Sequence, residues 1–196
     1  YITLEAQVVN LSDEIAYNNH DIDDGLSAGI LNESELTRHV TLWREGKLEI
    51  KKQYAQLEDH ELKYLINSYL ISQLIMDAFD TIQQKVKASG ITSKEDLQNL
   101  EKPLATFGKE MEEKNKELRK YLFQQFYSHP SVYRMNKKGQ KMIKGLFEEF
   151  SDDTRLLPEG YRNKVRKGEK VERVVADYIA GMTDTYALKE YQSIFG

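Results

Sequence analysis

Cysteine is absent from the 196 residues of this chain, and proline is rare. Without cysteine the chain has no disulfide, no zinc site with thiolate ligands and no thiol nucleophile. The three prolines, at positions 103, 130 and 158, leave long segments in which nothing interrupts a helix. No apolar run approaches the roughly 20 residues that span a membrane. These absences favour a cytoplasmic protein with no membrane partner.

The composition is that of an ordinary globular domain, since 40% of the residues are hydrophobic and 31% are charged. The net charge of -4 gives no sign of a chain that binds nucleic acid generally, although a local basic patch remains compatible with it. The sequence starts at Tyr1-Ile2-Thr3-Leu4, without an initiator Met or a signal-like segment. We therefore expect it to be a piece of a longer protein.

Apolar residues recur at helical spacing through most of the chain, and no pair of segments has the pattern of a hairpin. The sequence therefore predicts an all-α fold. A polar break is expected at 21–25, a short helix within the connector at 94–100, and a basic linker at 162–173. The expected helices cover residues 4–19, 25–31, 34–44, 59–88, 109–128, 131–151, 169–180 and 184–194, and 46–56 either continues the third helix or forms a loop.

The segment from Leu11 to Leu26 places Asp13, Tyr17 and Asp21 at i, i+4 and i+8. On a helix these positions form one stripe, which here interrupts an apolar face with two carboxylates and a phenol. A metal ion or a polar ligand would offset the cost of burying such groups. Spacing alone leaves a solvated face or a structural ion pair open, and the neighbouring His20-Asp21 dipeptide lacks a second histidine with ligand spacing.

Three ordered segments resemble one enzyme family. Residues 12–26 (SDEIAYNNHDIDDGL), 117–135 (ELRKYLFQQFYSHPSVYRM) and 176–195 (ADYIAGMTDTYALKEYQSIF) are similar to segments of bacterial dGTPase-like HD-domain triphosphohydrolases. The resemblance implies an HD-domain-type helical bundle whose N-terminal helices are missing from this chain. Residues 1–31 would be the last part of the catalytic core, and residues 32–196 would complete the substrate pocket and an oligomer surface.

The resemblance also implies roles for individual residues. Asp13 corresponds to the last ligand of an H…HD…D metal site, whose other ligands and general acid or base would lie upstream, so no catalytic residue is assigned in this chain. Tyr17 would pack against or hydrogen-bond the deoxyribose, and Asp21 would accept from its 3′-hydroxyl.

A second set of implied roles lies in the segment 117–135. Arg119 would bind phosphate, since a guanidinium suits phosphate oxygens, and Lys120 is the neighbouring candidate. Tyr127 would lie near the nucleoside, whereas Phe123 is expected to pack rather than to contact a ligand. Thr185 stands where many family members have Arg.

The implied reaction is metal-dependent hydrolysis of a dNTP to a deoxynucleoside and inorganic triphosphate. The cofactor would be a divalent ion, Mg or Mn, and the partners a dNTP substrate, further copies of the chain, and an effector dNTP or single-stranded DNA. Two alternatives stay open. One is an HD phosphohydrolase acting on nucleoside monophosphates or cyclic nucleotides. The other is a catalytically inactive helical module for oligomerisation, effector binding or single-stranded DNA binding.

Overall fold

A computed structural model describes residues 3–54, 56–93, 96–97, 100 and 102–196. Within these ranges it contains nine α-helices, one π-helical segment (η1) and one 3-10 turn (η2), and it contains no strand, so the predicted all-α class is confirmed. The chain divides into two compact units, residues 1–129 and 130–196, each with its own hydrophobic core. None of the helices in the described part of the chain is long and apolar enough to cross a membrane.

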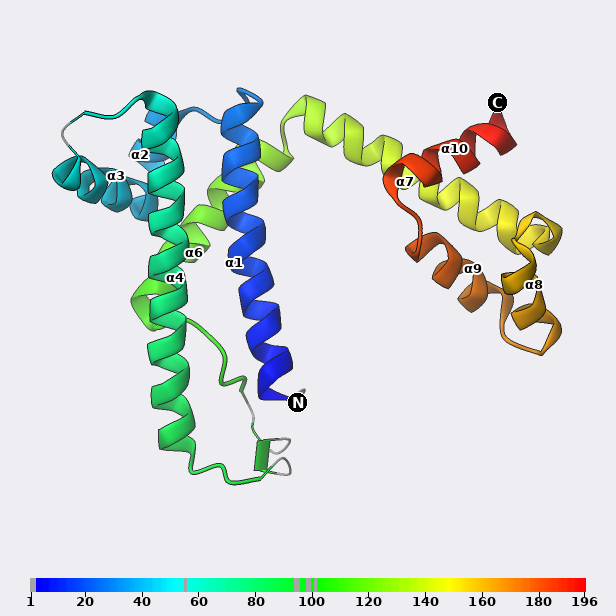
Figure 1. The fold of residues 1–196 in the computed structure, drawn as a ribbon, viewed down its shortest axis with the longest axis horizontal. Coiled ribbons are helices and arrows are strands. Elements are labelled where there is room, and N and C mark those ends of the chain that lie inside the picture. Colours follow the sequence, from blue (N-terminus) through cyan, green and yellow to red (C-terminus); the bar gives the residue numbers. More distant parts are fainter. Residues whose placement is uncertain (1–2, 55, 94–95, 98–99, 101) are drawn as a thin grey trace. The chain divides into compact units, whose positions relative to one another are not determined.

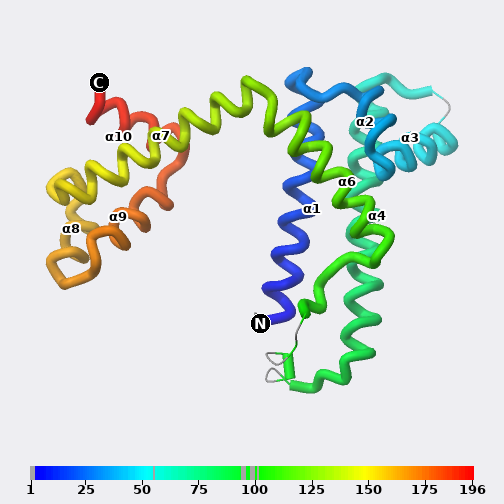
Figure 2. Tube along the Cα trace, turned by 180° about the vertical axis from the view of Figure 1, so that it is seen from behind, coloured from blue at the N-terminus to red at the C-terminus, as the bar shows by residue number. Residues whose placement is uncertain are grey.

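The first unit is built on two long helices, α1 and α4, which lie side by side with α6 running obliquely across them (Figures 1 and 2). Trp43, Ile22, Leu70 and Leu118 are fully buried where these helices meet. The elements of this unit are α1 (Leu4–Ser27), α2 (Glu33–His39), α3 (Thr41–Gln53), α4 (Asp59–Ser89), α6 (Lys109–Leu122) and η1 (Phe123–Tyr127).

Helix α1 continues through the polar stretch that was expected to end it, so the predicted break at 21–25 and the separate helix at 25–31 are wrong. Asp23 and Asp24 lie on the solvent side of the helix, where charged residues do not interrupt it. Gly25 is buried within the helix, and an added Cβ there would lie 2.5 Å from Leu31 Cδ1. The chain turns at Gly29, whose φ of 66° is accessible to glycine at little cost.

Two other predictions change in detail. The expected helix at 34–44 is two helices, which meet at Val40 with extended φ and ψ, and α3 extends to Gln53. The helix expected at 109–128 is α-helical only to Leu122 and continues as the π-helix η1. The predicted end of α4 is confirmed by Gly90, which has a φ of 64°. The short helix expected at 94–100 falls largely on residues outside the described ones.

The second unit is formed by α7, against which α9 and α10 pack, while α8 packs against α9. Its core contains Leu146, Phe150, Leu157, Val174 and Val175. The hydroxyls of Tyr178 and Tyr186 lie 3.0 Å apart and form a hydrogen bond between two helices of this unit. The elements are α7 (Pro130–Asp152), η2 (Thr154–Leu156), α8 (Glu159–Arg166), α9 (Val171–Ala180) and α10 (Asp184–Phe195).

Helix α8 lies where a basic linker was expected at 162–173. Tyr161 and Val165, one turn apart, pack against the core of the second unit and hold this short helix. Arg162 and Arg166 both pair with Glu159 in the first turn. The linker prediction is therefore wrong over residues 162–166, because it weighed local charge and overlooked two apolar residues at helical spacing.

Candidate functional site

Helices α1 and α6 are joined by a cluster of polar side chains. Glu14 Oε1 accepts hydrogen bonds from Asn115 Nδ2 at 2.8 Å and from Arg119 Nη1 at 3.1 Å. Asn18 Nδ2 donates to Asn115 Oδ1 at 3.4 Å, and both asparagines are buried. Because buried polar groups are stable only when they are hydrogen-bonded, this cluster fixes how the two helices face each other.

One turn further along α1, Asp21 accepts a hydrogen bond from the hydroxyl of Tyr127 in η1. Burial is the main reason that the pKa of Asp21 lies above its ordinary value. The hydrogen bond from Tyr127 opposes this increase, and the charge of Asp24 adds to it. The pKa of Tyr127 is raised well above its usual range. The causes are burial, the hydrogen bond to Asp21 and the charge of Asp21, and then the nearby Tyr17. Tyr127 therefore stays protonated and acts as a donor to Asp21.

The π-helix η1 places Tyr127 at this position. The backbone N–H of Ser128 donates to the carbonyl of Phe123 at 3.2 Å, which is an i→i+5 bond in place of the usual i→i+4 bond. Such single turns occur often at functional sites, because the extra residue redirects the side chains that follow it. Here Tyr127 is directed at α1 while Phe123 is left 66% exposed.

An open pocket of about 520 Å³ lies beside this cluster. Three of the side chains that line it are cationic: Lys116, Arg119 and Lys120. Lys116 pairs with Glu112 at 3.3 Å and Arg119 with Glu14 at 3.1 Å, whereas Lys120 has no ion pair among the described residues. This local excess of positive charge suits an anionic group. The complete lining is Asn18, Lys116, Arg119, Lys120, Leu122, Phe123 and Tyr127.

The structure brings four of the six residues predicted for the site into this region. Arg119, Lys120 and Tyr127 line the pocket, and Asp21 bonds to Tyr127. Tyr17 is 61% exposed on α1 and lies near Tyr127. The sixth residue, Asp13, is exposed one turn before Tyr17.

Asp13 makes no hydrogen bond and no ion pair with any other described residue, so its carboxylate is uncommitted. An exposed, unpaired carboxylate fits the role of one oxygen ligand to a divalent ion. The residues that the structure describes contain no group of three or more His, Cys, Asp or Glu able to hold a metal ion. A metal site that included Asp13 would therefore need further ligands from outside the described residues.

The sequence did not single out Glu14, Asn18 or Asn115 as site residues. Glu14 and Asn18 lie four residues apart on α1, and Asn115 and Arg119 lie four apart on α6. This repeated spacing was a signal that two polar stripes face each other. Phe123 was expected to pack rather than to contact a ligand, but it is 66% exposed and lines the pocket.

The chain is similar to one protein family and to several curated proteins. Residues 105–193 match the phosphohydrolase-associated domain family. Deoxyguanosinetriphosphate triphosphohydrolase-like proteins of Geobacter sulfurreducens and Geobacter metallireducens are each 41% identical to the chain over 193 residues. A protein of the same description from Thiobacillus denitrificans is 39% identical over 193 residues.

Each of these alignments covers 98% of this chain and 50% of the relative. The chain thus spans about half the length of the curated relatives that it matches. Identity near 40% over almost the whole chain establishes common ancestry. The chain is therefore a homologue of the deoxyguanosinetriphosphate triphosphohydrolase-like proteins, over about half of their length, and includes a phosphohydrolase-associated domain.

Proposed function

We propose that this chain supplies the sugar- and phosphate-binding part of a cytoplasmic, homo-oligomeric enzyme that hydrolyses a dNTP to a deoxynucleoside and inorganic triphosphate. The observation that carries the proposal is the pocket beside the α1–α6 polar cluster. Side chains from two segments about 100 residues apart meet there, and three of those lining the pocket are cations. The names of the curated relatives support a nucleoside triphosphate as the anion.

Arg119 and Lys120 would hold the phosphates. Arg119 uses one N–H on Glu14, and a guanidinium has five, so donors remain for phosphate oxygens. Lys120, which has no carboxylate partner in the described part of the chain, adds a mobile point charge. Glu14 limits the attraction of Arg119 for anions and at the same time holds the guanidinium in place.

The sugar would lie against Tyr17 and Asp21. The hydroxyl of Tyr127 occupies one acceptor position of the Asp21 carboxylate, and a carboxylate has further lone pairs that can accept a bond from a 3′-hydroxyl. The exposed ring of Tyr17 offers a flat apolar surface beneath a deoxyribose, on which a 2′-hydroxyl would be poorly accommodated. Discrimination between deoxyribose and ribose would follow from these two contacts.

Asp13 would hold a divalent metal ion, Mg or Mn, together with ligands outside this chain. Such an ion supplies charge stabilisation at the phosphorus and lowers the pKa of a bound water. In this proposal, residues 1–31 would belong to the catalytic core, and residues 32–196 would complete the substrate pocket and an oligomer surface. The isolated chain would bind nucleotide and release no triphosphate.

The proposal is tested first by nucleotide binding. The change Arg119→Gln should weaken dGTP binding about tenfold, which corresponds to the loss of a charge-assisted hydrogen bond. Isothermal titration calorimetry measures this, with Lys109→Gln as the control, since Lys109 is an exposed cation at the start of the same helix. Equal binding by Arg119→Gln and Lys109→Gln would remove Arg119 from the site.

The metal role is tested in a full-length protein that contains this chain. Asp13→Ala should abolish triphosphate release while the oligomeric state stays unchanged, whereas Asp23→Ala, an exposed carboxylate on the same helix, should stay active. Resolving triphosphate from pyrophosphate and phosphate also distinguishes this reaction from that of an HD enzyme acting on monophosphates or cyclic nucleotides. Turnover that survives in Asp13→Ala would refute the metal role.

A second candidate function, binding of single-stranded DNA, is favoured by the charge of helix α7. Between Pro130 and Phe147 there are five basic residues and no acidic one. All five are exposed, and their spacing places them on one face of the helix: Arg134, Lys137, Lys138, Lys141 and Lys144. Within the described residues, Lys144 pairs with Glu148 and the other four have no carboxylate partner. A basic stripe of this kind matches the phosphates of a nucleic acid backbone.

Fluorescence anisotropy with a labelled single-stranded oligonucleotide tests this second function. The double change Lys138→Glu and Lys141→Glu should weaken binding by at least about tenfold and reduce its dependence on salt. The control is Lys167→Glu with Lys170→Glu, which alters charge equally elsewhere in the same unit. Equal losses in the two variants would mean that net charge alone attracts the DNA.

A further inference from the structure

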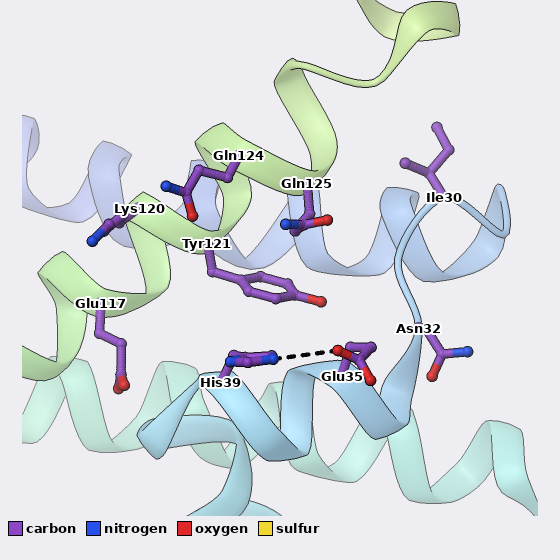
Figure 3. Close-up of a pocket in the computed structure, with 9 residues that line it drawn as sticks. All are labelled: Ile30, Asn32, Glu35, His39, Glu117, Lys120, Tyr121, Gln124 and Gln125. Atoms are coloured by element: carbon purple, nitrogen blue, oxygen red, sulfur yellow. Dashed lines mark ion pairs between the residues drawn. The ribbon is translucent and has the colours of Figure 1, made fainter.

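A second pocket, of about 390 Å³, lies between the segment of residues 30–39 and the helix formed by α6 and η1 (Figure 3). It takes its lining from a face of α6 adjacent to the one that lines the phosphate pocket. Glu117, Tyr121, Gln124 and Gln125 belong to this second pocket alone, and Lys120 lines both pockets. The second pocket is thus separate from the proposed substrate site and shares one residue with it.

Two rings give the second pocket a flat wall. The imidazole of His39 faces the phenol of Tyr121, with ring centroids 6.3 Å apart and planes inclined by 21°. Glu35 Oε2 lies 3.3 Å from His39 Nε2 and holds the imidazole in this orientation. Tyr121 is buried whereas the side chain of His39 is about half exposed, so part of the imidazole is accessible from the pocket.

The rest of the lining consists of hydrogen-bonding groups. Gln124 and Gln125 have carboxamides that make no hydrogen bond to any described residue. Figure 3 shows both of them on the α6 side of the pocket, above the ring of Tyr121. Glu117 Oε2 accepts from the backbone N–H of Thr41 at 2.8 Å, which leaves its second oxygen available. The pocket therefore offers free amide donors and acceptors, together with carboxylate acceptors.

The balance of charge distinguishes this pocket from the first one. Two carboxylates, from Glu35 and Glu117, accompany a single ammonium from Lys120, and Glu35 is itself paired with Arg38 at 3.4 Å. Burial, and then the charge of Glu35, raises the pKa of Tyr121, so its hydroxyl remains protonated. The lining therefore has no excess of positive charge to attract a polyphosphate, whereas an uncharged group with N–H donors can bond to its carboxylate and carboxamide oxygens.

We propose that this second pocket binds an uncharged nucleoside whose base carries an exocyclic amine. A planar base can stack on the imidazole, in the way that bases stack on aromatic side chains of nucleic-acid-binding proteins. Carboxamides and carboxylates are the groups that pair with amine-bearing base edges, whereas thymine offers a carbonyl at the corresponding position. Guanine, adenine and cytosine nucleosides therefore fit better than thymidine, which has no exocyclic amine to donate to a carboxylate.

The site goes beyond the proposed function, since it requires neither a metal ion nor triphosphate hydrolysis. It also has a consequence for the first pocket, and that consequence rests on the proposed function. Lys120 lines both pockets, and the π-helix η1 contributes Gln124 and Gln125 to the second pocket and Phe123 and Tyr127 to the first. A nucleoside in the second pocket would therefore change the phosphate affinity of the first pocket through Lys120.

Isothermal titration calorimetry of the 196-residue chain with 2′-deoxyguanosine, 2′-deoxyadenosine, 2′-deoxycytidine and thymidine tests the proposal. The three amine-bearing nucleosides should bind below about 1 mM, and thymidine should bind at least about tenfold more weakly. His39→Ala and Gln124→Leu should each weaken binding about tenfold or more. Both side chains are exposed, so neither change disturbs the core.

Matched controls separate this site from the first pocket. His60→Ala and Gln84→Leu alter exposed residues of α4 and should leave nucleoside binding unchanged. Arg119→Gln, which weakens dGTP binding if the proposed function holds, should also leave nucleoside binding unchanged. Absence of nucleoside binding, equal binding of thymidine, or a loss in Arg119→Gln without a loss in His39→Ala would each overturn the second site.

Discussion

At the scale of single residues, the hydrogen bond from Tyr127 to Asp21 joins two segments that are 106 residues apart. Tyr127→Phe removes the hydroxyl and leaves a half-buried carboxylate without this donor. We expect the free energy of unfolding to fall by about 1 kcal/mol, because Asp21 keeps partial access to water. Urea denaturation followed by circular dichroism measures the change. Tyr133→Phe, at an exposed tyrosine of α7, is the control and should be neutral.

Gly25 lies within α1 at a point of close contact. A Cβ there would meet Leu31 Cδ1 at 2.5 Å and Phe126 Cδ2 at 3.2 Å, so one of these core side chains would have to move. Gly25→Ala should destabilise the protein by about 1–3 kcal/mol, as overpacked cores do.

Gly139, within α7, has no atom within 4 Å of the corresponding position and an ordinary helical φ. Gly139→Ala should therefore stabilise by about 0.5–1 kcal/mol, because alanine is the better helix former. Thermal melts of both variants give the comparison. A Gly25→Ala protein as stable as the parent would show that Leu31 can repack freely.

At the scale of elements, Asp153 caps the 3-10 turn η2 and pairs with Arg155. Its Oδ1 accepts from the backbone N–H of Arg155 at 2.9 Å, and its Oδ2 lies 2.6 Å from the guanidinium. These bonds lower the pKa of Asp153 from 3.8 to about 2. Because the folded-state pKa is depressed, the stabilisation is fully present above pH 3.8 and is lost as the pH falls through about 2.

Asp153→Asn keeps an oxygen that can cap the turn and removes the charge. The melting temperature of this variant should lie below that of the parent at neutral pH. The difference should shrink as the pH falls below 3.8 towards about 2. Asp152→Asn, at the exposed last residue of α7, provides the control. A difference that is independent of pH would contradict the assigned titration.

Most elements could be predicted from apolar periodicity, because α4, α7 and α10 each bury one stripe against a core. The end of α1 and the helix α8 could not be predicted in this way. The polar run at 21–25 has the composition of a break, and only the approach of Leu31 and Phe126 explains why a buried glycine continues the helix there. Local composition carries no information about such long-range packing.

The candidate site could likewise be predicted only in part from the sequence. The spacing of Asp13, Tyr17 and Asp21 identified one stripe of α1, and the resemblance supplied roles for its members. The partners of that stripe depend on how α6 crosses α1, so the bond from Arg119 to Glu14 could not be read from either segment alone. The π-helical register of η1 likewise has no signature in local propensity. The assignments of Asp13 to a metal ion and of Tyr17 to a sugar stay predictions.

At the scale of the whole molecule, the two hydrophobic cores share no residue. We therefore expect residues 1–129 and 130–196 to fold as separate fragments. Each should show a helical circular dichroism spectrum and a cooperative melt of its own, and calorimetry of the intact chain should resolve two transitions. A fragment 130–196 that is unfolded in isolation would show that its core depends on the first unit.

The charge of the chain is divided between the same two units. Residues 1–129 contain 15 Lys and Arg against 22 Asp and Glu, whereas residues 130–196 contain 13 against 10. The overall value of -4 thus combines an acidic unit with a basic one. Near neutral pH and at low ionic strength, the protein should be retained by both anion- and cation-exchange resins, and moderate salt should release it from each.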